Sequence, residues 1–141
     1  MNVDALPEAK GLPQDLDVVC VVFTPHATHV DLQSQATDRI WRVRFLGAEG
    51  HRVLDEGDLL EFWPECSTAN GSIFRVQSGG WFEQESRRQG FLKRDTQPGM
   101  PEYFITGENA CVSVLSHVPP ELFELAQPLA NSSHGNVPGA A

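Results

Sequence analysis

The most regular pattern in the chain is a set of short apolar runs separated by Gly, Pro and polar residues. In residues 40–46, apolar side chains alternate with Arg42 and Arg44, as in a half-buried antiparallel strand. Residues 18–23 are instead continuously apolar and largely β-branched, which is typical of a central strand covered on both faces. By these criteria the expected strands are 18–23, 40–46, 59–63, 72–78, 102–106 and 111–116.

Two segments have the pattern of short helices. Residues 81–89 lie between two glycines, and residues 121–127 lie between Pro120 and Pro128. Residues 26–38 show no clear period and predict a long loop, with a short element around Val30–Leu32 as the alternative.

These elements predict one α+β domain, mainly an antiparallel sheet of about five or six strands with one or two short helices. A chain of 141 residues has the length of one domain with a single core. Residues 1–16 contain two Pro and one Gly and predict a flexible N-terminal arm. We therefore expect the folded domain over residues 17–130 and a disordered C-terminal tail over residues 131–141.

The charge of the chain is strongly negative, because 19 acidic residues outnumber 10 basic ones and give a formal net charge of -9. Such a charge repels nucleic-acid phosphates and anionic lipids, and it attracts a basic protein partner. The longest uncharged apolar run is residues 18–23, far shorter than the roughly 18 residues of a membrane span. Asp4 and Glu8 stand where a signal peptide would have basic residues, so we expect a cytoplasmic protein that binds neither nucleic acid nor membrane.

The chain has three cysteines, at Cys20, Cys66 and Cys111. Their wide spacing without a C-x-x-C pair argues against a disulfide framework and against a zinc ribbon, so we expect reduced thiols. A nucleophilic Cys66 would need a histidine base, such as His51 or His117, brought to it by the fold. Because Glu65 precedes Cys66 and disfavours the thiolate, an ordinary loop cysteine is the preferred interpretation.

His26, His29 and Asp31 are candidate metal ligands. Two imidazoles three residues apart, with a carboxylate nearby, have the ligand types that bind zinc or iron. The preceding Pro25 and the absence of periodicity favour a loop, and no second set of ligands stands out elsewhere. We therefore expect a solvated loop here, with no metal and no cofactor.

Arg42, Arg44 and Arg75 lie on expected strands near aromatic residues, as on an oligonucleotide-binding sheet. Trp41 and Arg42 are neighbours in a strand and point to opposite faces, so base stacking and phosphate contact would not share one surface. Cross-strand pairing of these arginines with Glu61 is the simpler interpretation.

The densest run of acidic residues surrounds the aromatic residue Trp63. Its acidic members are Asp55, Glu56, Asp58, Glu61 and Glu65. Paired carboxylates can perform acid/base hydrolysis, but such a run more often forms a charged rim. An aromatic side chain ringed by charge also has the composition of a protein-binding face, and the alternative is that Trp63 lies in the core. We take these five acids and Trp63 as candidate partner-binding residues and assign no catalytic residue.

Three segments of the C-terminal half form an arrangement with a late pair of strands. They are Gly79-Gly80-Trp81-Phe82, residues 102–107, and residues 111–116, and a Pro-capped terminal helix is expected to follow them. In a compact acidic α+β domain, this arrangement resembles small bacterial immunity-type proteins that are encoded beside secreted polymorphic toxins. The resemblance implies a protein that binds and neutralises a cognate toxin domain and has no catalysis of its own.

The leading hypothesis is a non-enzymatic protein-binding protein, most concretely an immunity protein or antitoxin whose acidic surface covers a basic site of a toxin domain. The alternative is a small enzyme or a metal- or ligand-binding domain, with a site assembled from distant residues such as His26, His29, Cys66 or His117. A third possibility is an accessory or assembly subunit, and the oligomeric state stays open.

Overall fold

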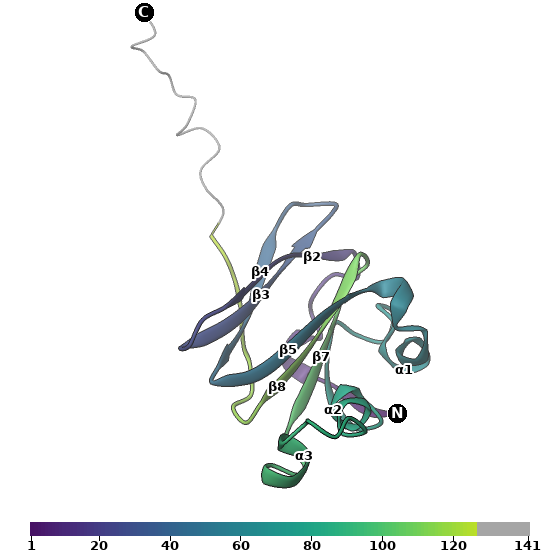
Figure 1. The fold of residues 1–141 in the computed structure, drawn as a ribbon. Coiled ribbons are helices and arrows are strands. Elements are labelled where there is room, and N and C mark those ends of the chain that lie inside the picture. Colours follow the sequence, from purple (N-terminus) through teal and green to yellow (C-terminus); the bar gives the residue numbers. More distant parts are fainter. Residues whose placement is uncertain (127–141) are drawn as a thin grey trace, which may run out of the picture.

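Two antiparallel sheets form the framework of the protein in the computed structural model, which describes residues 1–126 (Figure 1). The five-stranded sheet has the order β1 (Asn2–Ala5), β6 (Ile73–Ser78), β7 (Glu102–Thr106), β8 (Ala110–Ser116) and β5 (Ala48–Asp55). The four-stranded sheet has the order β2 (Leu16–Phe23), β3 (Ala27–Ser34), β4 (Ile40–Leu46) and β9 (Glu121–Glu124). The short helices are η1 (Pro7–Ala9), η2 (Glu56–Asp58), η3 (Leu60–Phe62), α1 (Trp63–Cys66), α2 (Trp81–Glu85) and α3 (Lys93–Thr96). The predicted α+β class with mainly antiparallel strands is confirmed, although the strands are divided between two sheets.

The main core lies between the two sheets. Val30, Val43 and Phe45 of the four-stranded sheet share one buried cluster with Ile105 and Val112 of the five-stranded sheet. Because side chains alternate along each strand, every second residue enters this core and the residues between them face outward. The pattern expected from residues 40–46 is therefore confirmed in β4, whose Trp41, Val43 and Phe45 are buried.

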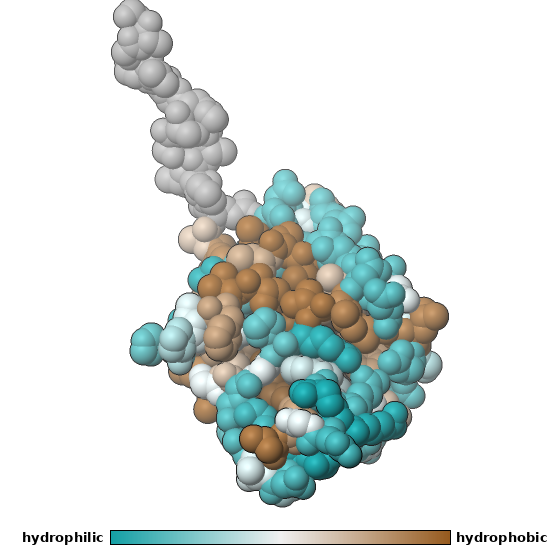
Figure 2. All heavy atoms as spheres, in the orientation of Figure 1, coloured by the Kyte–Doolittle hydropathy of each residue, from teal (hydrophilic) through white to brown (hydrophobic). Residues whose placement is uncertain are grey.

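Apolar side chains close one open side of this sandwich. The β2 edge of one sheet lies beside the β5 edge of the other, where the rings of Phe23 and His51 are 5.7 Å apart. Figure 2 shows apolar residues gathered on this side, and Val19, Phe23 and Val53 are among the exposed ones.

A layer of short helices covers the outer face of the five-stranded sheet (Figure 1). Phe62 packs edge-on against Phe104 of β7, with ring centroids 4.8 Å apart. Trp81 packs with Met100 and Leu115 in a separate buried cluster. Across residues 1–126, none of these helices has the length and apolar character needed to cross a membrane.

A buried carboxylate fixes the start of α2. Glu102 is 3% exposed and accepts hydrogen bonds from the backbone N–H groups of Trp81 and Phe82, each at 2.8 Å. These are donors that the first turn of a helix cannot satisfy internally. Gly80 permits this approach, because a Cβ atom there would overlap the carboxylate of Glu102 and the side chain of Val76.

The predicted loop over residues 26–38 is wrong, because its first half forms β3 between β2 and β4. Thr28, Val30, Leu32 and Ser34 are buried and alternate with residues that face outward. Thr28 and Ser34, the first and last of these buried residues, are polar, so the alternation of a strand is not visible in the sequence. The segment 18–23 is a strand as predicted, but β2 is an edge strand and not a central one, so its apolar run is partly exposed.

Two further elements differ from the sequence prediction. Residues 59–63 form helical turns in place of a strand, because Leu59 and Phe62 are buried three residues apart and Pro64 fits the start of α1. Residues 121–124 form β9 in place of a helix, with antiparallel pairing to β4. The expected arm contributes β1, which pairs with β6, whereas the expected tail over residues 131–141 lies outside the described residues.

Candidate functional site

Residues 55–65, which we call the acidic cap, follow β5 as three consecutive helical turns. The carboxylate of Asp55 accepts a hydrogen bond from the backbone N–H of Gly57 at 2.8 Å and so begins η2. Leu59 and Phe62 are 3% and 1% exposed and hold the cap on the five-stranded sheet. Glu61, which lies between these two anchors, and Asp58, which precedes them, are exposed to solvent.

The five carboxylates of the acidic cap are not neutralised by the protein itself. Within residues 1–126, none of them lies within 4.0 Å of a basic nitrogen, whereas Lys93 and five arginines are paired with acids elsewhere. Glu61 accepts only an amide hydrogen bond, from Gln84 Nε2 at 3.2 Å. Glu61 interacts with Arg52 at longer range, and the cap as a whole remains a concentration of negative charge without a direct ion pair to the described residues.

Leu60, and not Trp63, is the most exposed apolar residue of the cap. Leu60 is 71% exposed and lies between the exposed Asp58 and Glu61. The indole of Trp63 is half-buried, and its Nε1–H donates to the carbonyl of Glu56 at 3.0 Å. Sequence reasoning missed Leu60, although a residue next to anchors spaced three apart on a helical turn must point outward.

A second cluster lies on the outer face of the four-stranded sheet. Cys20 of β2 is opposite Asp31 of β3, and His29 lies two residues before Asp31 on the same face. The ligand atoms of these three residues all lie within 4.8 Å of one another. His26, which the sequence grouped with His29, is instead exposed in the turn before β3, so the structure replaces it by Cys20.

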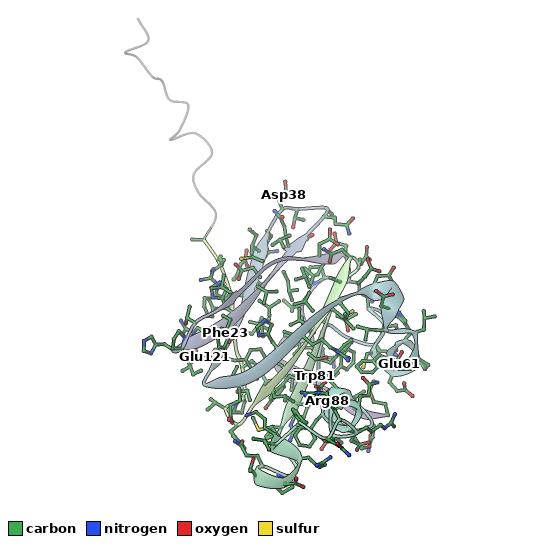
Figure 3. The ribbon with its side chains drawn as sticks, viewed as in Figure 1. Phe23, Asp38, Glu61, Trp81, Arg88 and Glu121 are labelled. Carbon is green, nitrogen blue, oxygen red and sulfur yellow. The ribbon has the colours of Figure 1, made fainter. Side chains whose placement is uncertain are left out.

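Figure 3 shows that the two candidate surfaces lie on different sides of the molecule. Glu61 of the acidic cap lies beside α1. Phe23 and Glu121, at the ends of β2 and β9, lie on the side of the four-stranded sheet. The cap and the Cys20 cluster are therefore separate surfaces and can be tested independently.

Arginines on the four-stranded sheet are paired with acids of neighbouring strands. Arg42 donates from Nε and Nη2 to the two oxygens of Asp31 at 2.8 and 3.0 Å, and this hydrogen bonding raises the pKa of Arg42. Arg44 pairs with Glu121 and lies over the ring of Phe123. The expected pairing with Glu61 is therefore wrong, because the acids that face these arginines come from β3 and β9.

Two of the three cysteines belong to the core. Cys66 and Cys111 are buried in the cluster beneath the cap, where burial raises their pKa values to about 12 and about 11. His51 packs against Phe23, and His117 Nε2 lies 2.8 Å from Gln97 Oε1. Cys66 is thus a neutral core thiol, in a setting that does not activate a nucleophile.

Comparison of the chain with protein-family models, with curated proteins and with solved structures found no match.

Proposed function

We propose that this chain is a non-enzymatic protein-binding protein that uses the acidic cap to bind a basic surface of a partner. One observation carries the proposal: Leu60 is 71% exposed within a segment of eleven residues whose five carboxylates form no ion pair with the described residues. Unpaired charges attract an oppositely charged surface over long range and align it.

Leu60 supplies the short-range part of the interaction. Complete burial of a leucine side chain contributes about 1.5–3 kcal/mol, which is the scale of an interface anchor. The buried Leu59 and Phe62 hold the turn in place before binding, so little ordering is required when a partner arrives. The negative charge of the cap also disfavours the binding of acidic surfaces.

The specific form that we propose is an immunity protein whose cap covers a basic site of a cognate toxin domain. The arrangement of residues 79–116 and the net charge of -9 support this specific form. The resemblance also implies a terminal helix, whereas the structure has the strand β9 at that place. Its toxin would be encoded by a neighbouring gene, since such pairs are produced together. An accessory subunit would bind its partner equally well but would not suppress a toxic activity.

The direct test is binding of the neighbouring gene's product, measured by calorimetry at low and at raised salt. Asp58→Asn with Glu61→Gln in the cap should weaken binding at least about tenfold, and Leu60→Ala should weaken it similarly. The matched control is Glu83→Gln with Asp95→Asn, the same loss of charge at exposed acids on α2 and α3, which should change the affinity less than about twofold. Equal effects of the two double variants, or no binding at all, would contradict the proposal.

A further inference from the structure

We propose that Cys20, His29 and Asp31 bind a divalent transition-metal ion of the zinc type, with a fourth position open to water or to an external ligand. This site is separate from the acidic cap and does not depend on the function proposed for it. It rests on the placement of three donor atoms by two adjacent strands of the four-stranded sheet.

A β-bulge places Cys20 in the cluster. In β2, Val18 is opposite Leu32 and Cys20 is opposite Asp31, so Val19 is an extra residue in the strand. If the register of residues 16–18 continued without the bulge, Val19 would lie opposite Asp31, and Cys20 would lie opposite Val30 and point into the core between the sheets. Bulges commonly redirect a side chain at a functional site, and here the redirected side chain is a thiol.

The distances suit a metal of this class. Zinc binds thiolate sulfur at about 2.3 Å and nitrogen or oxygen at about 2.0–2.2 Å, so ligand atoms of one tetrahedral site lie about 3.5 Å apart. The three donor atoms already lie within 4.8 Å of one another, and His29 Nε2 is 4.0 Å from Asp31 Oδ2. Small side-chain rotations of the exposed Cys20 and the half-buried His29 therefore complete the triangle.

Arg42 orients the carboxylate ligand. Asp31 is 7% exposed, and both of its oxygens accept hydrogen bonds from the Arg42 guanidinium. Each carboxylate oxygen has a second lone pair, so these bonds leave coordination sites on the carboxylate. Hydrogen bonds of this kind fix metal-binding carboxylates in many sites, and their loss costs about 10–100-fold in metal affinity. The charge of the neighbouring Arg44 is compensated by Glu121.

The donor set selects the metal. One thiolate sulfur, one imidazole nitrogen and one carboxylate oxygen suit Zn²⁺ and Co²⁺, whereas Mg²⁺ and Ca²⁺ require oxygen ligands. Three protein ligands with one open position is the composition of zinc sites at which water or a substrate binds. The sequence offered His29 and Asp31 as candidate ligands together with His26, but only strand pairing brings Cys20 to them.

Titration of the reduced, full-length protein with Co²⁺, followed by absorption spectroscopy, tests this site. We expect one Co²⁺ per chain, a thiolate-to-cobalt charge-transfer band, tetrahedral d–d bands, and displacement of Co²⁺ by Zn²⁺. Cys20→Ser should abolish the charge-transfer band, and His29→Gln should weaken binding at least about tenfold. Arg42→Lys should weaken binding while the charge-transfer band remains, as expected for a positioning residue.

The matched control is His26→Gln, which removes an exposed histidine three residues from His29 and should leave the Co²⁺ affinity unchanged. Thermal unfolding of each apo variant shows whether it is folded, and Cys20 is exposed, so Cys20→Ser should melt with the wild type. The proposal is overturned by a charge-transfer band that persists in Cys20→Ser, by equal losses from His26→Gln and His29→Gln, or by an absence of binding at stoichiometric Co²⁺.

Discussion

The two outer faces of the sandwich use charged residues in different ways. On the bare four-stranded sheet, Arg42 is paired with Asp31 and Arg44 with Glu121 across neighbouring strands. On the helical side, the carboxylates of the acidic cap have no basic partner within residues 1–126. Arg42 and Arg44 of the first face are satisfied by acids of the same sheet, whereas the five carboxylates of the cap form no ion pair with the described residues and are available to another molecule.

Burial explains why the two faces differ. Asp31 is 7% exposed and would be costly without a counter-ion, while Asp58 and Glu61 are exposed and remain hydrated. The helical side has one buried acid, Glu102, which is satisfied by backbone N–H groups and not by an arginine. Stability should therefore depend on Asp31 and Glu102, and binding should depend on the cap.

The largest effect is expected from Glu102→Ala. It leaves the N–H groups of Trp81 and Phe82 without their acceptor at the buried start of α2, where each lost bond costs about 1–3 kcal/mol. We expect the free energy of unfolding in urea to fall by about 3 kcal/mol. Glu83→Ala, an exposed acid in the same helix, should change it by less than about 0.5 kcal/mol. A loss below about 1 kcal/mol for Glu102→Ala would show that this carboxylate does not hold the helical layer.

Asp31→Asn is expected to have the next largest effect. It removes the charge that faces Arg42 and turns one acceptor into a donor, but Arg42 keeps 29% side-chain exposure. Partial hydration of Arg42 places the cost below that of a fully buried pair, at about 2 kcal/mol by urea unfolding with EDTA present. Glu121→Gln, which breaks the exposed pair with Arg44, should cost less than about 1 kcal/mol. Equal costs would contradict the role assigned to burial.

Strands with a clean period could be predicted from the sequence, and strands with mixed faces could not. β4 and the pair β7 and β8 follow apolar alternation or continuous apolar runs and were expected. β3 was missed because Thr28 and Ser34 are polar but buried, with Ser34 Oγ donating to Asp15. The sequence predicts a strand over residues 59–63 because a short apolar run fits both the strand and the helix period when only Leu59 and Phe62 define it.

The two candidate sites also differ in how much of each could be predicted from the sequence. The acidic cap is contiguous in the chain, so its five carboxylates could be identified from the sequence, while the exposed Leu60 required knowledge that the segment is helical. The cluster of Cys20, His29 and Asp31 depends on strand register and on one bulge. The local pattern pointed to His29 and Asp31, but a register shift of one residue turns every side chain to the other face, so it could not add Cys20 to them.

Acidification should affect the two faces in opposite directions. Burial raises the pKa of Glu102 above its ordinary 4.5, although the hydrogen bonds from backbone N–H groups act in the opposite direction. The contribution of Glu102 to stability is therefore present below pH 4.5 and is lost as pH rises through the folded pKa. Hydrogen bonding by Arg39 lowers the pKa of Glu124, so its contribution is present above 4.5 and is lost as pH falls through the folded pKa.

Urea unfolding of the wild type, Glu102→Gln and Glu124→Gln between about pH 7 and pH 3 measures these contributions. As pH falls, the stability deficit of Glu102→Gln relative to the wild type should widen, and the deficit of Glu124→Gln should narrow. Both variants keep the size of the side chain, so the difference in slope reports the titrating group. Parallel profiles for all three proteins would show that neither carboxyl has a shifted pKa.

The smallest effect on stability is expected in the acidic cap, where it is the most informative about function. Asp58→Asn with Glu61→Gln removes two charges from a group of unpaired carboxylates, so it relieves repulsion and should raise the free energy of unfolding by up to about 0.5 kcal/mol at low salt. The gain should disappear near 1 M NaCl, where the screening length falls to about 3 Å. A loss of more than about 1 kcal/mol would mean that these carboxylates hold the cap together. If the cap binds a partner as proposed, its acids weaken the fold slightly and are retained for binding, which would separate the cap from the paired charges of the opposite face.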